Sequence, residues 1–145
     1  MLIENVWQLE GLDIGMLKKR QEPKGLIMCS PEGFQVHEVH NYFMRGNITK
    51  VEQTTAMRDW QTLHDTLARM TNVKVVRGES DCPDMIFAAN AALTVRFPDS
   101  PKVALMSRMV YPSRRKETLP YEAYLRSQGY EIITLPEEVF YEGQG

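Results

Sequence analysis

The hydrophobic and polar positions along the chain predict an alternation of strands and helices. Within 53–71, apolar side chains recur at steps of three and four, which is typical of an amphipathic helix capped by Thr54 or Thr55. A second helix is indicated over 120–128, with Gly129 in the left-handed position beyond its last turn. Short apolar or β-branched runs predict strands over 24–30, 73–76, 85–88, 92–97, 103–106, 130–135 and 139–141.

A weak internal repeat is visible in this order of elements. The pattern strand–helix–strand–strand occurs once over 26–87 and again over 104–141. Repeats of one such unit suggest units stacked about an axis or side by side, whereas an ordinary α/β sandwich also alternates strands and helices. Periodicity alone does not choose between the two. A turn is expected over 98–101, between two of the strands.

The last residues carry a turn signal that directly follows an apolar strand. Gly143 and Gly145 flank a glutamine, which favours a tight turn in which the backbone closely approaches another segment. We expect the natural polypeptide to continue beyond this turn, so that the chain is a fragment.

Composition and charge narrow the class of protein. The 145 residues fit one ordinary domain, with 43% hydrophobic and 25% charged residues. A net charge of −2 provides no field for nucleic acid or anionic lipid, and no apolar run approaches the ~20 residues that span a bilayer. The residues 1–16 show neither the basic start nor the clean apolar stretch of a secretory signal, so none is expected there, and the two cysteines suggest no disulfide framework. We therefore expect a cytoplasmic protein with neither nucleic-acid nor membrane partners.

Few residues suggest chemistry by their type alone. His37 and His40 could share a metal ion only on a helix, and the β-branched residues around them argue against one, so we expect no metal site. His64 lies in the first predicted helix, one residue after Leu63, and is expected to be a boundary residue. Cys29 is interpreted as a buried, inert thiol and Cys82 as a free loop cysteine. No glycine-rich phosphate loop is present, and no cofactor is expected.

Two polar clusters leave alternatives open. Asp81, Asp84 and Asn90 surround the short apolar run over 85–88, which could aim the amide of Asn90 into a pocket, but a solvent loop with a turn-forming asparagine is slightly favoured by composition. Arg114 and its basic neighbours suit a carboxylate or phosphate ligand, because a guanidinium binds such groups with two parallel hydrogen bonds. A solvated run of charges is the more common explanation of such a cluster.

Taken together, five segments resemble the N-terminal half of the amidinotransferase-type guanidine-modifying enzymes. This family includes dimethylarginine dimethylaminohydrolases, arginine deiminases and arginine dihydrolases. The resemblance implies an α/β fold, the pentein, which is a five-bladed α/β propeller of ββαβ units, present here as about half a domain. It also implies that 24–145 is the family-like region and 1–23 an N-terminal extension. The segments, in the family's order, are 26–34, 39–44, 83–91, 113–117 and 140–145.

The resemblance assigns roles to matching positions. Asn41 matches a residue that lines the substrate pocket, Asp84 an aspartate that contacts substrate, and Asn90 the residue that holds the guanidinium. Arg114 matches an arginine that binds the substrate's carboxylate, and Glu142 matches the acidic member of the catalytic set. These residue types suit the ligand, because a guanidinium is a planar cation whose N–H donors need carboxylate and amide oxygens.

Departures from the family's pattern refine the expectation. Many deiminases have aspartate at the position of Asn90, and an asparagine there resembles the dihydrolases. Ala89 replaces an acidic residue of some dimethylaminohydrolases. The family's histidine and its nucleophilic cysteine follow the position of Glu142, so the resemblance implies that this chain alone is catalytically inert. The expected partners are a small guanidine substrate such as arginine, and a missing C-terminal half or a second copy. The alternatives are a non-catalytic pentein fragment that binds a ligand or a protein, and a truncated product that self-associates.

Overall fold

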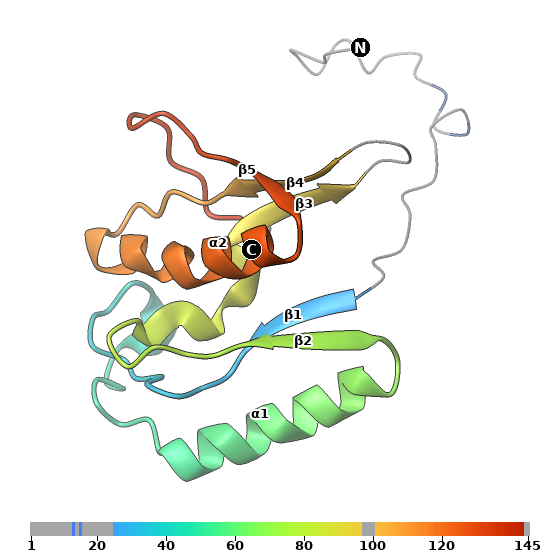
Figure 1. Cartoon of the computed structure of the whole chain (residues 1–145). Coiled ribbons are helices and arrows are strands. Elements are labelled where there is room, and N and C mark those ends of the chain that lie inside the picture. The colour runs from blue at the N-terminus through green and yellow to red at the C-terminus, as the bar shows by residue number, and fades with distance from the viewer. Residues whose placement is uncertain (1–12, 14, 16–24, 97–100, 144–145) are drawn as a thin grey trace.

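The computed structural model describes residues 13, 15, 25–96 and 101–143, which form two α/β units that pack on each other (Figure 1). The first unit contains β1 (Gly25–Cys29), α1 (Gln53–Ala68) and β2 (Asn72–Val76). The second contains β3 (Ala92–Arg96), β4 (Lys102–Met106), α2 (Thr118–Ser127) and β5 (Tyr130–Ile133). No helix within the described ranges is long and apolar enough to cross a membrane.

The first unit is a parallel strand pair joined by a helix. β1 and β2 pair in the register Leu26↔Val73 and Met28↔Val75, and α1 covers the pair on the side away from α2 (Figure 1). The expected strands and helix are confirmed here, but the expected cap is wrong. Glu52, rather than a threonine, caps α1, because its carboxylate accepts hydrogen bonds from the backbone amides of Thr54 and Thr55 at 3.2 and 2.8 Å.

The second unit is a mixed three-stranded sheet in the order β3–β4–β5. β3 is antiparallel to β4, whereas β4 and β5 are parallel and are connected by α2. This ββαβ arrangement agrees with the unit that the resemblance implies. Gly129, just past α2, has a φ of +76°, so its expected left-handed conformation is confirmed.

The core lies between the two units, around the buried side of α2. Cys29 and Val76 from the first unit pack in one buried cluster with Ala104 and Leu125 from the second. The buried Tyr121 hydroxyl, on α2, donates a hydrogen bond to the backbone carbonyl of Met85. The two units are therefore joined by a shared apolar core rather than by a surface contact alone.

Two predicted strands are wrong. The run over 85–88 forms parts of two short 3₁₀ helices, Pro83–Ile86 and Ala88–Asn90, because Pro83 in the first turn favours a helical backbone. The segment 139–141 makes a single antiparallel bridge between Tyr141 and Arg108 instead of a strand. The expected turn over 98–101 lies mostly outside the described residues, as do the end of the strand expected over 92–97, the extension 1–23 apart from residues 13 and 15, and Gly145.

The expected close approach of the C-terminal turn is confirmed at Gly143. Its φ is +66°, and a Cβ atom built there would lie 2.2 Å from the carbonyl oxygen of Ala89. The backbone of this segment therefore packs directly on the 3₁₀ helix Ala88–Asn90.

Candidate functional site

Asp84 and Arg114, predicted from separate segments, meet in a buried group of charges. Asp84 lies in the 3₁₀ helix Pro83–Ile86 and is 5% exposed, and Arg114 lies in the 3₁₀ helix Pro112–Glu117 and is 9% exposed. The Nε of Arg114 is 3.6 Å from the Oδ2 of Asp84. The solvated-run interpretation is therefore wrong for Arg114, whose neighbour Arg115 is the exposed one.

Glu117 completes this group and was missed in the sequence. Its Oε2 accepts a hydrogen bond from Arg114 Nε at 3.0 Å, and its Oε1 accepts one from the backbone amide of Asp84 at 3.2 Å. Burial raises the pKa of the Glu117 carboxyl, although the neighbouring Arg114 opposes that shift. The signal was its spacing: in a 3₁₀ helix, residues three apart lie on the same side, so Arg114 and Glu117 face the same way.

The carboxylate of Asp84 has unused hydrogen-bonding capacity. Within the described ranges, no donor lies at hydrogen-bonding distance from either of its oxygens, although the residue is almost completely buried. In the same part of the chain, Arg114 donates its hydrogen bond through Nε, and its terminal nitrogens make none. The Asp84 oxygens are not among the fully buried atoms without a partner, so they keep some access to solvent, and this pair is suited to a ligand with both donors and acceptors.

His40 is the second residue that the sequence did not place in the site. Its Nε2 lies 3.6 Å from Asp84 Oδ2 and 3.8 Å from Glu38 Oε2, and its ring centre is 4.0 Å from that of Tyr111. Ser113 donates a hydrogen bond to Glu38 at 2.9 Å. These contacts fasten the loop that carries His40 to the segment that carries Arg114. His37 is exposed, and no three metal-ligating side chains gather anywhere in the described structure.

Asn41 lies on the outer side of this site. It is exposed, and its side-chain oxygen accepts a hydrogen bond from the backbone amide of Met44 at 3.2 Å, which caps the short helix Tyr42–Met44. With Phe34, Phe43 and Phe87 it lines an open hollow of about 400 Å³. Phe87 links the hollow to the buried charges, because the guanidinium carbon of Arg114 lies 6.0 Å from its ring centre.

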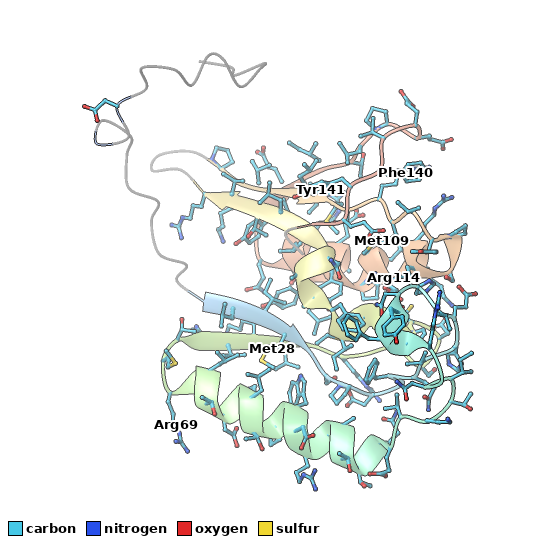
Figure 2. The ribbon with its side chains drawn as sticks, turned by 180° about the vertical axis from the view of Figure 1, so that it is seen from behind. Met28, Arg69, Met109, Arg114, Phe140 and Tyr141 are labelled. Atoms are coloured by element: carbon cyan, nitrogen blue, oxygen red, sulfur yellow. The ribbon has the colours of Figure 1, made fainter. Side chains whose placement is uncertain are left out.

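Asn90 and Glu142 form a second pair. The Nδ2 of Asn90 donates a hydrogen bond to the backbone carbonyl of Glu142 at 3.2 Å. The side chain of Glu142 turns elsewhere, because its Oε1 accepts a hydrogen bond from the backbone amide of Val110 at 3.0 Å. In Figure 2, Arg114 and Tyr141 are both labelled well away from Arg69, which lies at the lower left of the view. In the described part of the chain, no hydrogen bond or ion pair joins this pair to Asp84 and Arg114.

The two cysteines are poor nucleophiles in this environment. Both are free and buried, so the interpretation of Cys29 as a buried thiol and that of Cys82 as a free loop cysteine are confirmed. Burial raises the pKa of both thiols, that of Cys82 to about 11. Since the thiolate is the reactive form, neither group is prepared for attack at neutral pH.

The chain is similar to curated enzymes that act on arginine derivatives. It is 32% identical over 120 residues to the bifunctional arginine dihydrolase/ornithine cyclodeaminase ArgZ of Synechocystis sp., covering 83% of this chain and 16% of ArgZ. It is 29% identical over 120 residues to the N(G),N(G)-dimethylarginine dimethylaminohydrolase of Mycobacterium tuberculosis, covering 81% of this chain and 37% of that enzyme. The chain thus spans about a sixth and about a third of these two relatives. No protein-family profile matches it.

A comparison of folds indicates a relationship to the same enzymes. The crystal structure of the product-bound N-terminal domain of ArgZ, an arginine dihydrolase, superposes with a TM-score of 0.76 at 32% identity, over 82% of this chain and 42% of that domain. The chain is therefore similar to these enzymes over most of its own length and to less than half of the domain that matches it. The relationship includes the segments that carry Asp84 and Arg114, and by sequence and fold the chain is similar to guanidine-modifying pentein enzymes.

Proposed function

We propose that this chain is the substrate-binding part of a guanidine-modifying hydrolase that acts on arginine or a close relative of it. The observation that carries the proposal is the buried Asp84 carboxylate, which lacks hydrogen-bond donors beside an Arg114 whose terminal nitrogens are unused within the described residues. A guanidinium supplies N–H donors to the carboxylate of Asp84, and an α-carboxylate supplies acceptors to the terminal nitrogens of Arg114. Arginine carries both groups.

The remaining site residues receive roles that fit their contacts. Since the Nδ2 of Asn90 is held by the carbonyl of Glu142, its side-chain oxygen is left to accept from a guanidinium. Asn41 lines the pocket from the outer loop. Glu142 acts as the acidic catalytic residue once its carboxylate leaves the amide of Val110. Asn90 and the relationship to ArgZ favour a dihydrolase, which removes both terminal nitrogens of the guanidine, over a deiminase.

The same proposal extends to the architecture and activity of the whole protein. Residues 24–145 supply about half of a five-bladed pentein propeller, of which β3–β4–α2–β5 is one ββαβ unit, and 1–23 form an N-terminal extension. The other half, or a second copy, covers the site. The raised thiol pKa values of Cys29 and Cys82 leave the described residues without a ready nucleophile, so the chain alone binds arginine without hydrolysing it. The protein works in the cytoplasm.

Calorimetric titration of the full chain with L-arginine tests the binding role. We expect Asp84→Asn to weaken binding about tenfold, because a charge-assisted hydrogen bond is lost. Asp81→Asn is the matched control: Asp81 lies three residues away, but it is exposed and paired with Lys116 at 2.6 Å, so this change leaves affinity within about twofold. Agmatine, which lacks the carboxylate, should bind about tenfold more weakly than arginine if Arg114 holds that group. An Asp84→Asn variant that binds arginine like the wild type would contradict the proposal.

The second candidate is a binding module without chemistry, which the protonated cysteines favour. The two are separated by measuring ammonia and ornithine released from arginine by the natural polypeptide that contains this chain. Two ammonia molecules per ornithine indicate a dihydrolase, whereas arginine binding without either product indicates the module.

A further inference from the structure

Two cationic or N–H-bearing side chains from distant segments converge on the same oxygen of Asp84. Arg114 Nε and His40 Nε2 each lie 3.6 Å from Oδ2, and no hydrogen bond from the described residues reaches Oδ1. Arg114 is already fixed by Glu117, which accepts its Nε hydrogen bond. His40 is therefore the second group that can set the direction of this carboxylate.

The imidazole of His40 is itself held in place. Its side chain is 12% exposed, and its ring lies against that of Tyr111, whose hydroxyl donates a hydrogen bond to the His40 backbone carbonyl at 3.4 Å. The backbone amide of His40 points to the sulfur of Met44 at 3.4 Å. A ring that packs on an aromatic neighbour, on a backbone fixed by two contacts, is preorganised, so its nitrogen can orient a neighbour at low entropic cost.

The charges around His40 favour an N–H that points toward Asp84. Glu38 Oε2 lies 3.8 Å from the same nitrogen and is fixed by Ser113. The groups that face the ring are thus the carboxylates of Glu38 and Asp84, the phenol of Tyr111 and, beyond Asp84, the guanidinium of Arg114. Between two carboxylates, a hydrogen on Nε2 is favourable in the neutral ring as well as in the protonated one.

We propose that His40 is a positioning residue for Asp84. Together with the positive charge of the Arg114 guanidinium, whose Nε–H is donated to Glu117, it holds Oδ2, and this leaves Oδ1 directed at the donors of a bound guanidinium. This inference rests on the proposed function, because it assumes that Asp84 receives the guanidinium. His40 does not touch the ligand in this role, and it affects affinity only through Asp84.

The test compares two replacements of His40 in calorimetric titrations of the full chain with L-arginine. His40→Leu keeps an apolar contact with Tyr111 but removes the N–H, and we expect affinity to fall about tenfold. His40→Gln restores an N–H at similar reach, and we expect affinity within about threefold of the wild type. If His40 had only a structural role, the N–H of the His40→Gln variant would not restore the affinity that His40→Leu loses. The control is His64→Leu, since His64 also lies beside an aspartate, at 3.0 Å from Asp65, and stacks on Trp60, but in α1.

A second measurement does not need a ligand. Urea unfolding of the wild type, His40→Leu, Asp84→Asn and the double variant forms a cycle that measures the coupling of the two side chains. We expect the double variant to lose less stability than the two single variants combined.

The outcomes separate the two proposals. Wild-type affinity in His40→Leu, or an equal loss in His40→Gln, overturns the positioning role while leaving the proposed function in place. If the wild-type chain binds no arginine, the proposed function fails. In that case coupling in the cycle supports the link between His40 and Asp84, and strict additivity overturns it.

Discussion

Replacing Gly143 by alanine is expected to detach the segment that carries Glu142 from the 3₁₀ helix Ala88–Asn90. Two penalties act together at this position. An L-residue in the left-handed region costs about 1–2 kcal/mol, and Gly143 has a φ of +66°. The added Cβ would also lie 2.2 Å from the carbonyl oxygen of Ala89, well inside the 3.0 Å that real Cβ contacts respect. Relief requires a backbone shift, because the obstructing atoms belong to the main chain.

The steric penalty resembles overpacking of a core, which costs about 1–3 kcal/mol. The docked arrangement therefore loses about 2–5 kcal/mol in total. The loss of global stability is smaller if the segment simply lifts off, since detachment limits the strain to the free energy of docking. In either case the bridge between Arg108 and Tyr141 and the hydrogen bond from Asn90 to the Glu142 carbonyl are weakened.

Gly46 provides the matched control, since its φ is +74° but a Cβ there would have no atom within 4 Å. Gly46→Ala therefore carries the conformational penalty without the collision. Urea unfolding gives the global effect of each change, and amide hydrogen exchange at Arg108 and Tyr141 gives the local one. We expect faster exchange at both amides in Gly143→Ala and no change there in Gly46→Ala. Equal effects of the two substitutions on stability and exchange would show that the close approach at Ala89 carries no energy.

Three further predictions concern single groups. Arg114→Leu should cost about 3 kcal/mol in urea unfolding, because two buried carboxylates lose their common cationic partner, whereas Arg115→Leu should cost less than about 1 kcal/mol; equal losses would contradict the buried pairing. The pKa of Glu52 is lowered to about 2 by the amides and hydroxyl groups that it caps, so its stabilisation is present above pH 4.5 and is lost as the pH falls toward 2. Glu52→Gln should therefore reduce the dependence of the urea midpoint on pH between 4.5 and about 2, and an unchanged slope would refute this. The pKa of Cys82 is raised from 9.0 to about 11, so the stability from its protonated form is present below pH 9 and is lost as the pH rises toward 11. Cys82→Ser should flatten the fall in the urea midpoint over that range, and a fall as steep as that of the wild type would show that Cys82 is not its source.

The regular elements were predictable because local sequence determines them. The stripe of apolar residues in 53–71 gave α1, and Gly129 gave the end of α2. The errors occurred where the local sequence supports two alternative structures almost equally well. The run over 85–88 has the length and composition of a buried strand, but Pro83 starts a 3₁₀ turn that buries Met85 and leaves Phe87 exposed. The cap of α1 was misassigned because threonine is a more usual cap than glutamate.

The candidate site was predictable in part, and for a different reason. The resemblance identified Asp84 and Arg114, and the structure brings them together. It could not identify Glu117 or His40, because their roles arise from pairings between remote segments. Glu117 binds the amide of a residue 33 positions earlier, and the loop with His40 is held to Ser113 through a hydrogen bond that spans 75 positions. No pattern of neighbouring residues reports such pairings.

These long spans also determine when the site can form during folding. The strand pair β4–β5 is closed over 28 positions by a single helix, so its contacts are comparatively local, whereas the β1–β2 pair spans 47 positions. The cluster around Asp84 instead needs the loop at 38–41, the helix Pro83–Ile86 and the segment 111–117 to arrive together, which requires closure of long loops. We therefore expect the ligand-binding surface to assemble after the β3–β4–β5 sheet and to open before it as denaturant rises. Its rate of formation, rather than that of the strands, would then limit how soon a newly made chain can bind arginine.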